Sequence, residues 1–314
     1  MCTAISHKSY VGRNLDVDKG YGEEVVIAPK GYPFRFKSHA NIISHYAMIG
    51  MGLVKDDYPL YFDAANECGL YIAGLNYLGN ARYLPPDKEK INLAPYELIP
   101  YILSKCSSVS EAEYELKMIN LTAVPFSHDM KIAELHFFIA DRSSSIVAEP
   151  NSDGLKVYEN RIGVLTNNPP FPMQLFNLNN YINLTNEAPT NRFSPSLKLQ
   201  RYSFGMGALG LPGDLSSASR FVRAAFHKLN SNGKDTLADI FHLLSSVAMP
   251  DGSVRLGCGF ERTEYTSAVD LSRLIYSYRV YESPNTYAVK MNEWDIDGEN
   301  LIRFKLKREK EPLY

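Results

Sequence analysis

The chain has 314 residues, of which 45% are apolar and 22% are charged, so it can bury one large core or two smaller ones. Its 33 basic and 35 acidic residues leave a net charge of -2, which argues against binding to a polyanion such as nucleic acid. Its apolar stretches, such as residues 47–54, are far shorter than the roughly 20 residues that span a bilayer, so we expect no membrane helix.

The residues that follow Met1 turn polar after a few positions and contain no long apolar segment of the kind found in signal peptides. We therefore expect a protein of the cytoplasm. The four cysteines, Cys2, Cys68, Cys106 and Cys258, lie far apart without a CxxC pair, which argues against a disulfide framework and a zinc site. The seven histidines show neither HxxxH nor HExxH spacing, so we expect no metal.

Short runs of β-branched and aromatic residues at both ends of the chain indicate strands. The first cluster predicts a meander of antiparallel strands at residues 3–5, 9–15, 24–28, 46–53, 60–64 and 69–76, with glycine, proline and aspartate in the turns between them.

Helical spacing of apolar residues follows in the middle of the chain. It predicts two pairs of helices, at 95–105 with 109–119 and at 217–229 with 235–247. Strands are expected between these pairs and after them, at 134–140, 145–149, 155–159, 161–165, 263–269, 272–281, 286–291 and 301–306.

This order of elements predicts an α+β fold in which two packed antiparallel sheets are flanked by helical layers. We expect a single domain over residues 1–314. The segment 183–213 is polar, contains proline and glycine, and is weakly periodic. It is a long functional loop, an arm that clasps a neighbouring subunit, or a linker between domains.

Cys2, directly after the initiator Met1, is the most informative residue. Removal of Met1 would leave one residue that carries both a thiol nucleophile and an α-amine able to act as its base. Arg13 and Asp16 lie in the segment GRNLD, the second strand of a hairpin that begins at Cys2, and alternation puts Arg13 and Leu15 on one face. A cation beside the thiol would lower its pKa. The alternatives are an inert cysteine in a strand and an ordinary surface ion pair.

Five ordered segments, MCTAI, GRNLD, YFDAANECGLYIAGLN, VLTNNPPF and LSSASRFVR, resemble the choloylglycine hydrolase family. This family contains bile salt hydrolases and penicillin V acylases and belongs to the N-terminal nucleophile hydrolases. The similarity continues to FERTEYTSA near residue 268 and so spans most of the chain. It implies the four-layer αββα sandwich of that superfamily and a bacterial enzyme.

The resemblance also implies roles for residues at the start of the chain. Cys2 would be the nucleophile after Met1 is removed, Arg13 the cation beside its thiol, and Asp16 the carboxylate that orients the α-amine. The thiolate would attack an amide carbonyl, the α-amine would protonate the leaving amine, and water would release the acyl group. This chemistry requires no metal and no organic cofactor.

Three further residues complete the site that the resemblance implies. Asn76 would help to form the oxyanion hole, Asn167 would form a hydrogen bond at the same centre, and Arg220 would complete the charged site. Asn168 is adjacent to Asn167, so the register between them stays open. Asparagines near glycine and proline commonly form turns, and a helical arginine commonly lies on a solvated face, so each residue also has a structural interpretation.

The substrate implied first is a glycine- or taurine-conjugated bile salt, because Asn76 resembles the bile salt hydrolases whereas penicillin V acylases tend to carry tyrosine there. Penicillin V or a related N-acyl amide is the alternative. Leu15 and Val17 flank Asp16 and are candidates to line a steroid pocket, although strand residues of this kind are commonly core. The resemblance suggests a homotetramer.

Two interpretations compete with an amidase. One is a non-catalytic binding protein that keeps the same fold. The other is a dinucleotide enzyme, on the strength of GMGALG at residues 205–210, but the strand and helix that this fingerprint needs are missing around it.

Overall fold

The computed structural model describes residues 1–257 and 259–308, so that Cys258 and residues 309–314 lie outside the described residues. The first sheet has the order β12-β1-β2-β14-β15-β16, with β13 paired to β14, and every pairing is antiparallel. Its strands are β1 (Cys2–His7), β2 (Tyr10–Val17), β12 (Val164–Leu165), β13 (Val254–Leu256), β14 (Gly259–Asp270), β15 (Ile275–Val280) and β16 (Tyr287–Lys290).

The second sheet has the order β11-β10-β9-β6-β5-β4-β3-β17 and is also antiparallel. Its strands are β3 (Glu24–Ala28), β4 (Met48–Lys55), β5 (Tyr58–Asn66), β6 (Tyr71–Asn76), β9 (Leu135–Ala140), β10 (Ser145–Asn151), β11 (Gly154–Glu159) and β17 (Ile302–Lys305). A short parallel pair, β7 (Ile91–Leu93) with β8 (Ile119–Leu121), lies outside both sheets.

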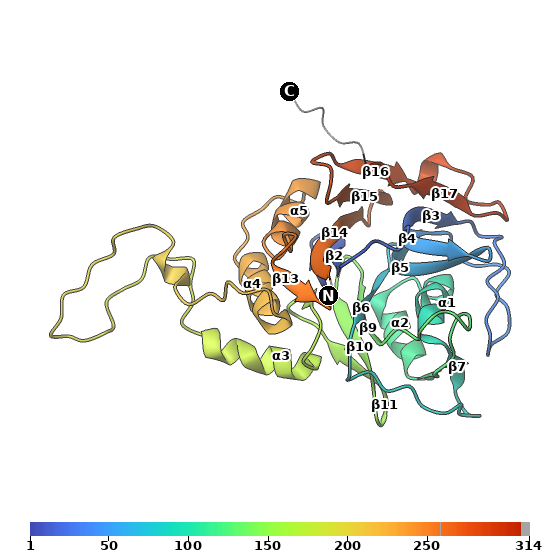
Figure 1. The fold of residues 1–314 in the computed structure, drawn as a ribbon, viewed down its shortest axis with the longest axis horizontal. Helices are drawn as coiled ribbons and strands as arrows, with labels where there is room; N and C mark the ends of the chain where they lie inside the picture. The colour runs from blue at the N-terminus through green and yellow to red at the C-terminus, as the bar shows by residue number, and fades with distance from the viewer. Residues whose placement is uncertain (258, 309–314) are drawn as a thin grey trace.

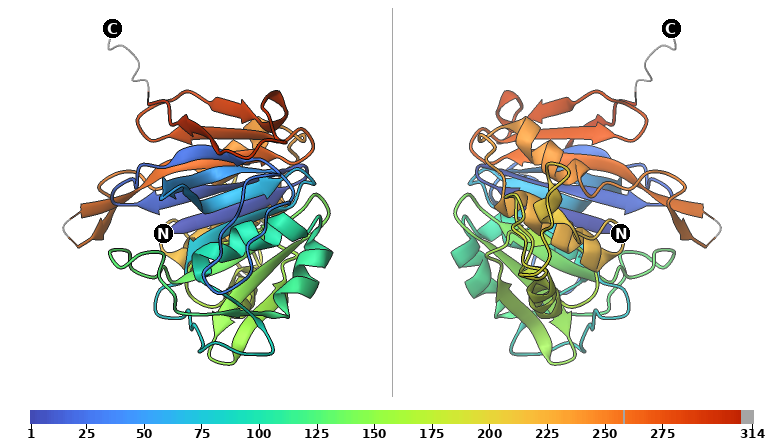
Figure 2. Two further views of the ribbon diagram at one scale, coloured as in Figure 1. Left: turned by 90° about the vertical axis from the view of Figure 1, so that its right-hand side faces the viewer. Right: turned by 90° about the vertical axis from the view of Figure 1, so that its left-hand side faces the viewer.

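Helices cover the outer face of each sheet (Figure 1). α1 (Leu98–Lys105) and α2 (Val109–Leu116) pack on the second sheet, whereas α4 (Ser217–Leu229) and α5 (Leu237–Ser245) pack on the first. The two panels of Figure 2 show these helix pairs on opposite sides of the strands. The expected fold of two antiparallel sheets between helical layers is therefore confirmed. No helix among the described residues is long and apolar enough to cross a membrane.

The helices begin where the sequence offers a capping side chain. Ser108, Ser216 and Thr236 accept hydrogen bonds from backbone N–H groups in the first turns of α2, α4 and α5. Behind these helices lie two apolar clusters, one centred between the sheets and one between the second sheet and α1 with α2. The capping of α4 matters for the site, because this helix carries Arg220.

Four expectations about individual elements were wrong. The first strands do not form one meander: β1 and β2 pair in one sheet while β3 to β6 form the other. A helix, α3 (Phe171–Asn177), lies where none was predicted, since its seven residues are too few to show a clear helical period. The helix expected at 109–119 ends at Leu116, because Ile119 begins β8. The strand expected at 161–165 is reduced to β12, Val164–Leu165.

The segment 183–213 projects from the body as a long arm (Figure 1). Its regular structure consists of one 3-10 turn, Met206–Ala208, which falls within the GMGALG segment. Large apolar side chains on the arm are exposed, among them Phe193, Tyr202 and Phe204. The glycines of GMGALG therefore do not connect a strand to a helix, as a dinucleotide site requires.

Candidate active site

Cys2 is the first residue of β1, and a tight hairpin brings β2 beside it. The turn residues are Lys8 and Ser9, and the ladder pairs Cys2 directly with Leu15. Residues opposite each other in an antiparallel pair project on the same face, as do alternate residues of one strand. The hairpin therefore places Cys2, Arg13, Leu15 and Val17 on one face of the sheet.

The Arg13 guanidinium contacts the thiol of Cys2. Its Nη2 donates to Cys2 Sγ at 2.7 Å, and its Nη1 donates to the backbone carbonyls of Phe62 at 2.9 Å and Gly74 at 2.8 Å. Phe62 is the extra residue of a β-bulge between β4 and β5, which frees its carbonyl from the ladder. Burial is the largest single effect on Arg13 and opposes its charge, but Cys2, Tyr265 and Asp63 act together against it and raise the pKa of Arg13 above its usual value.

Asn167 lies against the main chain of Cys2. The backbone N–H of Cys2 donates to Asn167 Oδ1 at 2.9 Å, and Asn167 Nδ2 donates to the carbonyl of Asn76 at 2.7 Å. The neighbouring Asn168 instead donates through Nδ2 to the carbonyl of Leu78 at 2.7 Å. Of the two candidate asparagines, the structure brings Asn167 to Cys2.

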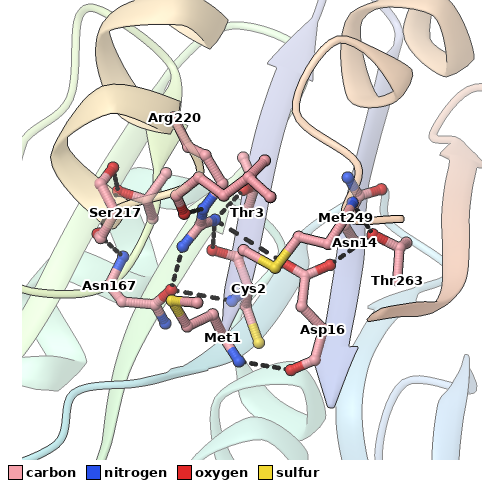
Figure 3. A network of polar contacts seen from close by, with 12 residues as sticks. Met1, Cys2, Thr3, Asn14, Asp16, Asn167, Ser217, Arg220, Met249 and Thr263 are labelled. Carbon is pink, nitrogen blue, oxygen red and sulfur yellow. Dashed lines mark hydrogen bonds and ion pairs between the residues drawn. The ribbon is translucent and has the colours of Figure 1, made fainter. Parts of the chain in front are cut away.

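Arg220 reaches the same centre from α4, on the other side of the first sheet (Figure 3). Its guanidinium donates to the carbonyl of Cys2 at 2.7 Å, to Thr3 Oγ1 at 2.5 Å and to Asn167 Oδ1 at 2.7 Å. It is fully buried, and burial lowers its pKa, an effect that Asp16 opposes. Arg220 therefore lies in the site and not on a solvated helix face.

Asp16 lies on the face of β2 opposite to Arg13. Thr263 donates to its Oδ1 at 2.7 Å, and Arg220 Nη1 lies 3.8 Å from its Oδ2. While Met1 is in place, its terminal ammonium forms an ion pair with Glu261 at 2.6 Å. Asp16 bonds to Met1 through its backbone and not through its carboxylate. The carboxylate of Asp16 thus contacts Thr263 and Arg220 in this form of the chain.

Several supporting residues have no signal of their own in the sequence. Ser217 Oγ accepts from the backbone N–H of Asn167 at 2.7 Å, and Gln174 Nε2 donates to the carbonyl of Asn167 at 2.6 Å. A buried pair, His136 with Glu149, holds the preceding carbonyl of Thr166 through His136 Nε2 at 2.9 Å. Ser217 belongs to the segment LSSASRFVR, but Gln174 and His136 lie in elements that carry no recognisable motif.

A cavity of about 490 Å³ opens above the thiol, with Cys2 and Arg13 in its lining. Leu15 and Val17 line the same cavity, as does Asn76 at the end of β6. The other walls are largely aromatic or aliphatic: Tyr21, Leu53, Leu60, Tyr61, Phe62, Pro95, Tyr96, Ile99, Val124, Pro125, Phe126, Met130, Ile132, Ala133 and Leu135. The volume and the apolar walls suit a small amphiphilic molecule.

The arrangement provides a thiol, a cation and the amide residue Asn76 in the lining of a largely apolar cavity. That combination is suited to acyl transfer, in which a thiolate attacks a carbonyl carbon. Among the described residues, no group of three or more histidine, cysteine, aspartate or glutamate side chains is placed to hold a metal ion.

The family model for linear amide C-N hydrolases of the choloylglycine hydrolase family matches residues 2–304. The chain belongs to this family. As a member it is a hydrolase of linear amide C–N bonds. The chain is 46% identical to a bile salt hydrolase/transferase of Lactiplantibacillus plantarum, over 98% of each sequence. It is 37% identical to a conjugated bile acid hydrolase of Lactobacillus gasseri, over 97% of this chain and all of the relative.

Solved structures agree with this assignment. A variant of the conjugated bile acid hydrolase from Clostridium perfringens superposes with a TM-score of 0.93 at 33% identity, covering all of this chain and 99% of the other. A penicillin V acylase from Agrobacterium tumefaciens superposes with a TM-score of 0.75 at 20% identity, covering all of this chain and 94% of the other. The second likeness shows a shared fold. This family member therefore has the architecture of an N-terminal nucleophile hydrolase.

Proposed function

We propose that this enzyme hydrolyses the amide bond of glycine- or taurine-conjugated bile salts, with Cys2 as its nucleophile. The observation that carries the proposal is the Cys2 thiol held by Arg13 at 2.7 Å at the floor of a cavity of about 490 Å³ with apolar walls. The relatives named for bile salt hydrolysis, matched over nearly the whole chain, support this choice of substrate. A bile acid has a rigid steroid body with one apolar face and a polar side chain, which suits such a cavity.

The proposed reaction begins once Met1 has been removed, so that Cys2 bears a free α-amine. The α-amine takes the thiol proton, and Cys2 Sγ bonds to the amide carbon while the carbonyl oxygen becomes an oxyanion. Arg13 stabilises the thiolate, and the proposed donors to the oxyanion are Asn76, which lines the cavity, and Asn167, whose Nδ2 also donates to the Asn76 carbonyl. Arg220 holds the carbonyl of Cys2, and Asp16 lies beside Arg220.

The intermediate then collapses with cleavage of the carbon–nitrogen bond. The α-amine gives its proton to the nitrogen of the leaving glycine or taurine, and the bile acid remains as a thioester on Cys2. A water molecule, deprotonated by the same α-amine, attacks the thioester and releases the bile acid, which restores the thiol. Each step uses atoms of Cys2, the substrate and water, so the proposal needs no cofactor.

We also propose that the arm 183–213 docks onto neighbouring copies of this chain in a homotetramer. Its exposed Phe193, Tyr202 and Phe204 would be covered in such an assembly, and exposed apolar clusters commonly mark interfaces. Native mass spectrometry of the wild type and of a Phe193→Ser, Phe204→Ser variant tests this. A monomeric wild type would contradict it. A location in the bacterial cytoplasm stays a prediction.

Release of glycine and taurine from conjugated bile salts, compared with hydrolysis of penicillin V, tests the proposed substrate. We expect the bile salts to be hydrolysed faster, and Cys2→Ala to abolish this activity while the circular dichroism spectrum stays unchanged. Equal rates, or activity on penicillin V alone, would overturn the choice of substrate. Full activity of the Cys2→Ala enzyme, or an active enzyme that retains Met1 by N-terminal mass spectrometry, would overturn the choice of nucleophile.

A further inference from the structure

A buried carboxylate lies behind Arg13 and has no part in the proposed reaction. Asp63, in β5, is fully buried between the two sheets. The hydroxyl of Tyr265 donates to its Oδ1 at 2.9 Å, and those of Tyr276 and Ser267 donate to its Oδ2 at 2.8 Å and 3.3 Å. Hydroxyl groups that donate to both oxygens favour the ionised form of a carboxylate.

The strand ladders place Asp63 close to the guanidinium of Arg13. Ser267, which donates to Asp63, lies directly opposite Arg13 in the β2–β14 ladder. Phe62, adjacent to Asp63 in the chain, supplies one of the carbonyls that hold Arg13. Burial raises the pKa of Asp63, while the positive charge of Arg13 and the three hydroxyl groups oppose this shift. Asp63 and Arg13 are therefore close enough to influence each other electrostatically.

The charge balance at Arg13 changes during acyl transfer. With Cys2 as a thiolate, the buried guanidinium faces two negative charges, the sulfur and Asp63. In the thioester the sulfur is neutral, so Asp63 is the anion left to compensate Arg13. An uncompensated buried cation is strongly unfavourable. Without Asp63, the guanidinium would lose its nearby countercharge each time the enzyme is acylated.

We propose that Asp63 is a positioning residue that balances the charge of Arg13 through the catalytic cycle. It keeps the guanidinium in place while Cys2 carries the acyl group, and it limits how strongly Arg13 stabilises the free thiolate. The second effect matters because a thiolate that is stabilised too strongly is a weaker nucleophile. The inference rests on the proposed role of Cys2 as the nucleophile.

The α-amine of mature Cys2 is the same in every variant, and the other side chains considered around Asp63 and Cys2 stay neutral near pH 7 or keep their charge. Burial raises the pKa of three tyrosines around Asp63 well above the usual value, so they remain protonated: Tyr71, Tyr265 and Tyr276. Around Cys2, burial raises the pKa of Tyr21, with a further contribution from Cys2 itself, and Arg220 contributes a fixed positive charge. A change in the titration of Cys2 after substitution of Asp63 therefore reports on Asp63 and Arg13.

The test is the rate at which iodoacetamide alkylates Cys2, followed from pH 5 to pH 10 by mass spectrometry of the N-terminal peptide. Removing the negative charge in Asp63→Asn is expected to lower the midpoint of the thiolate titration by about one pH unit. Glu97→Gln is the matched control. Glu97 is also fully buried, and it accepts from the backbone N–H groups of Lys37 at 2.7 Å and Ala94 at 2.8 Å, so its loss should leave the midpoint unchanged.

Asp63→Ser is a second variant, which removes the same charge and leaves space for a water molecule among the tyrosine hydroxyls. A lowered midpoint in either variant, with a reduced kcat and an unchanged KM for a conjugated bile salt, supports the proposal. An unchanged or raised midpoint overturns it. Failure of both variants to fold, while Glu97→Gln folds, also overturns it, because Asp63 would then be structural only. The alkylation readout does not depend on hydrolysis, so it separates this inference from the proposed function.

Discussion

Arg13 Nη2 lies 2.7 Å from Cys2 Sγ, while Nη1 of the same guanidinium is held by the carbonyls of Phe62 and Gly74. The planar fork of arginine allows one side chain to bridge the two carbonyls and the thiol. The cation is therefore fixed against the second sheet and presented to the thiol of Cys2 in the first. The surroundings of this thiol are formed at the junction of the two sheets.

The first prediction concerns this bridge. Arg13→Lys keeps the positive charge but cannot reach two carbonyls and the thiol together. We expect kcat/KM for a conjugated bile salt to fall about 100-fold, equivalent to about 3 kcal/mol of transition-state stabilisation. Alkylation of Cys2 at pH 7 should slow as well. Arg161→Lys is the control, since the Arg161 side chain is 84% exposed. An Arg13→Lys enzyme that is alkylated as fast as the wild type would contradict the prediction.

The second prediction uses the two adjacent asparagines as a matched pair. Asn167 contacts the Cys2 main chain and Asn76, whereas Asn168 contacts Leu78. We expect Asn167→Ala to lower kcat about 100- to 1,000-fold, the usual cost of losing an oxyanion-hole group, and Asn168→Ala to lower it less than about tenfold. Steady-state kinetics on one substrate compares them. Equal losses would show that the side chain of Asn167 has no special role.

The third prediction concerns the buried pair of Arg220 and Asp16, whose charged atoms lie 3.8 Å apart with both side chains fully buried. Arg220→Met leaves Asp16 without its cation, so we expect the free energy of unfolding to fall by about 3–5 kcal/mol. Adding Asp16→Asn should restore part of this loss, because no unpaired charge remains. Urea denaturation of both single variants and the double variant measures the coupling. If the losses in the free energy of unfolding of the two single variants simply add in the double variant, Asp16 and Arg220 do not stabilise each other.

The fourth prediction is a pH dependence at Lys228, whose ammonium donates to the carbonyl of Ile162. Burial lowers its pKa in the folded protein to about 8, from 10.5 in the unfolded chain. Below pH 8, Lys228 is protonated in both the folded and the unfolded chain, so the folded protein is destabilised by the buried positive charge. This destabilisation disappears as the pH rises from about 8 to 10.5. Stability of the wild type relative to Lys228→Met should therefore increase by about 2 kcal/mol over this range. Lys88→Met, at an exposed lysine, serves as the reference variant. A difference in stability between the wild type and Lys228→Met that does not change with pH would exclude the lowered pKa of Lys228.

The fifth prediction concerns the cavity wall. Val17→Ala removes two methyl groups that line the cavity beside Cys2, so we expect KM for a conjugated bile salt to rise about five- to tenfold with little change in kcat. Val269→Ala removes the same atoms from the core of the same sheet, away from the cavity lining. It should destabilise the fold without raising KM. A similar KM for both variants would argue that Val17 acts only in packing.

Much of the fold follows from local patterns in the chain. The alternation of β2 places Arg13, Leu15 and Val17 on one face because strand side chains have a period of two, and that period requires no tertiary information. Apolar residues at helical spacing likewise locate α2 and α4. α3 was missed because seven residues show too little periodicity, and the strands assigned to one meander divide between two sheets because strand pairing is not a local property.

The sequence by itself determined that a cysteine follows the initiator methionine, that an arginine shares its hairpin, and that the chain belongs with the choloylglycine hydrolases. Only the tertiary structure decided which asparagine meets Cys2, that Arg220 bonds to a carbonyl 218 positions away, and that Asp63 lies behind Arg13. The physical reason is that a buried charge is stable only with partners, and those partners come from strands and helices far apart in the chain. Which residues become the partners of a buried charge depends on how the two sheets pack together.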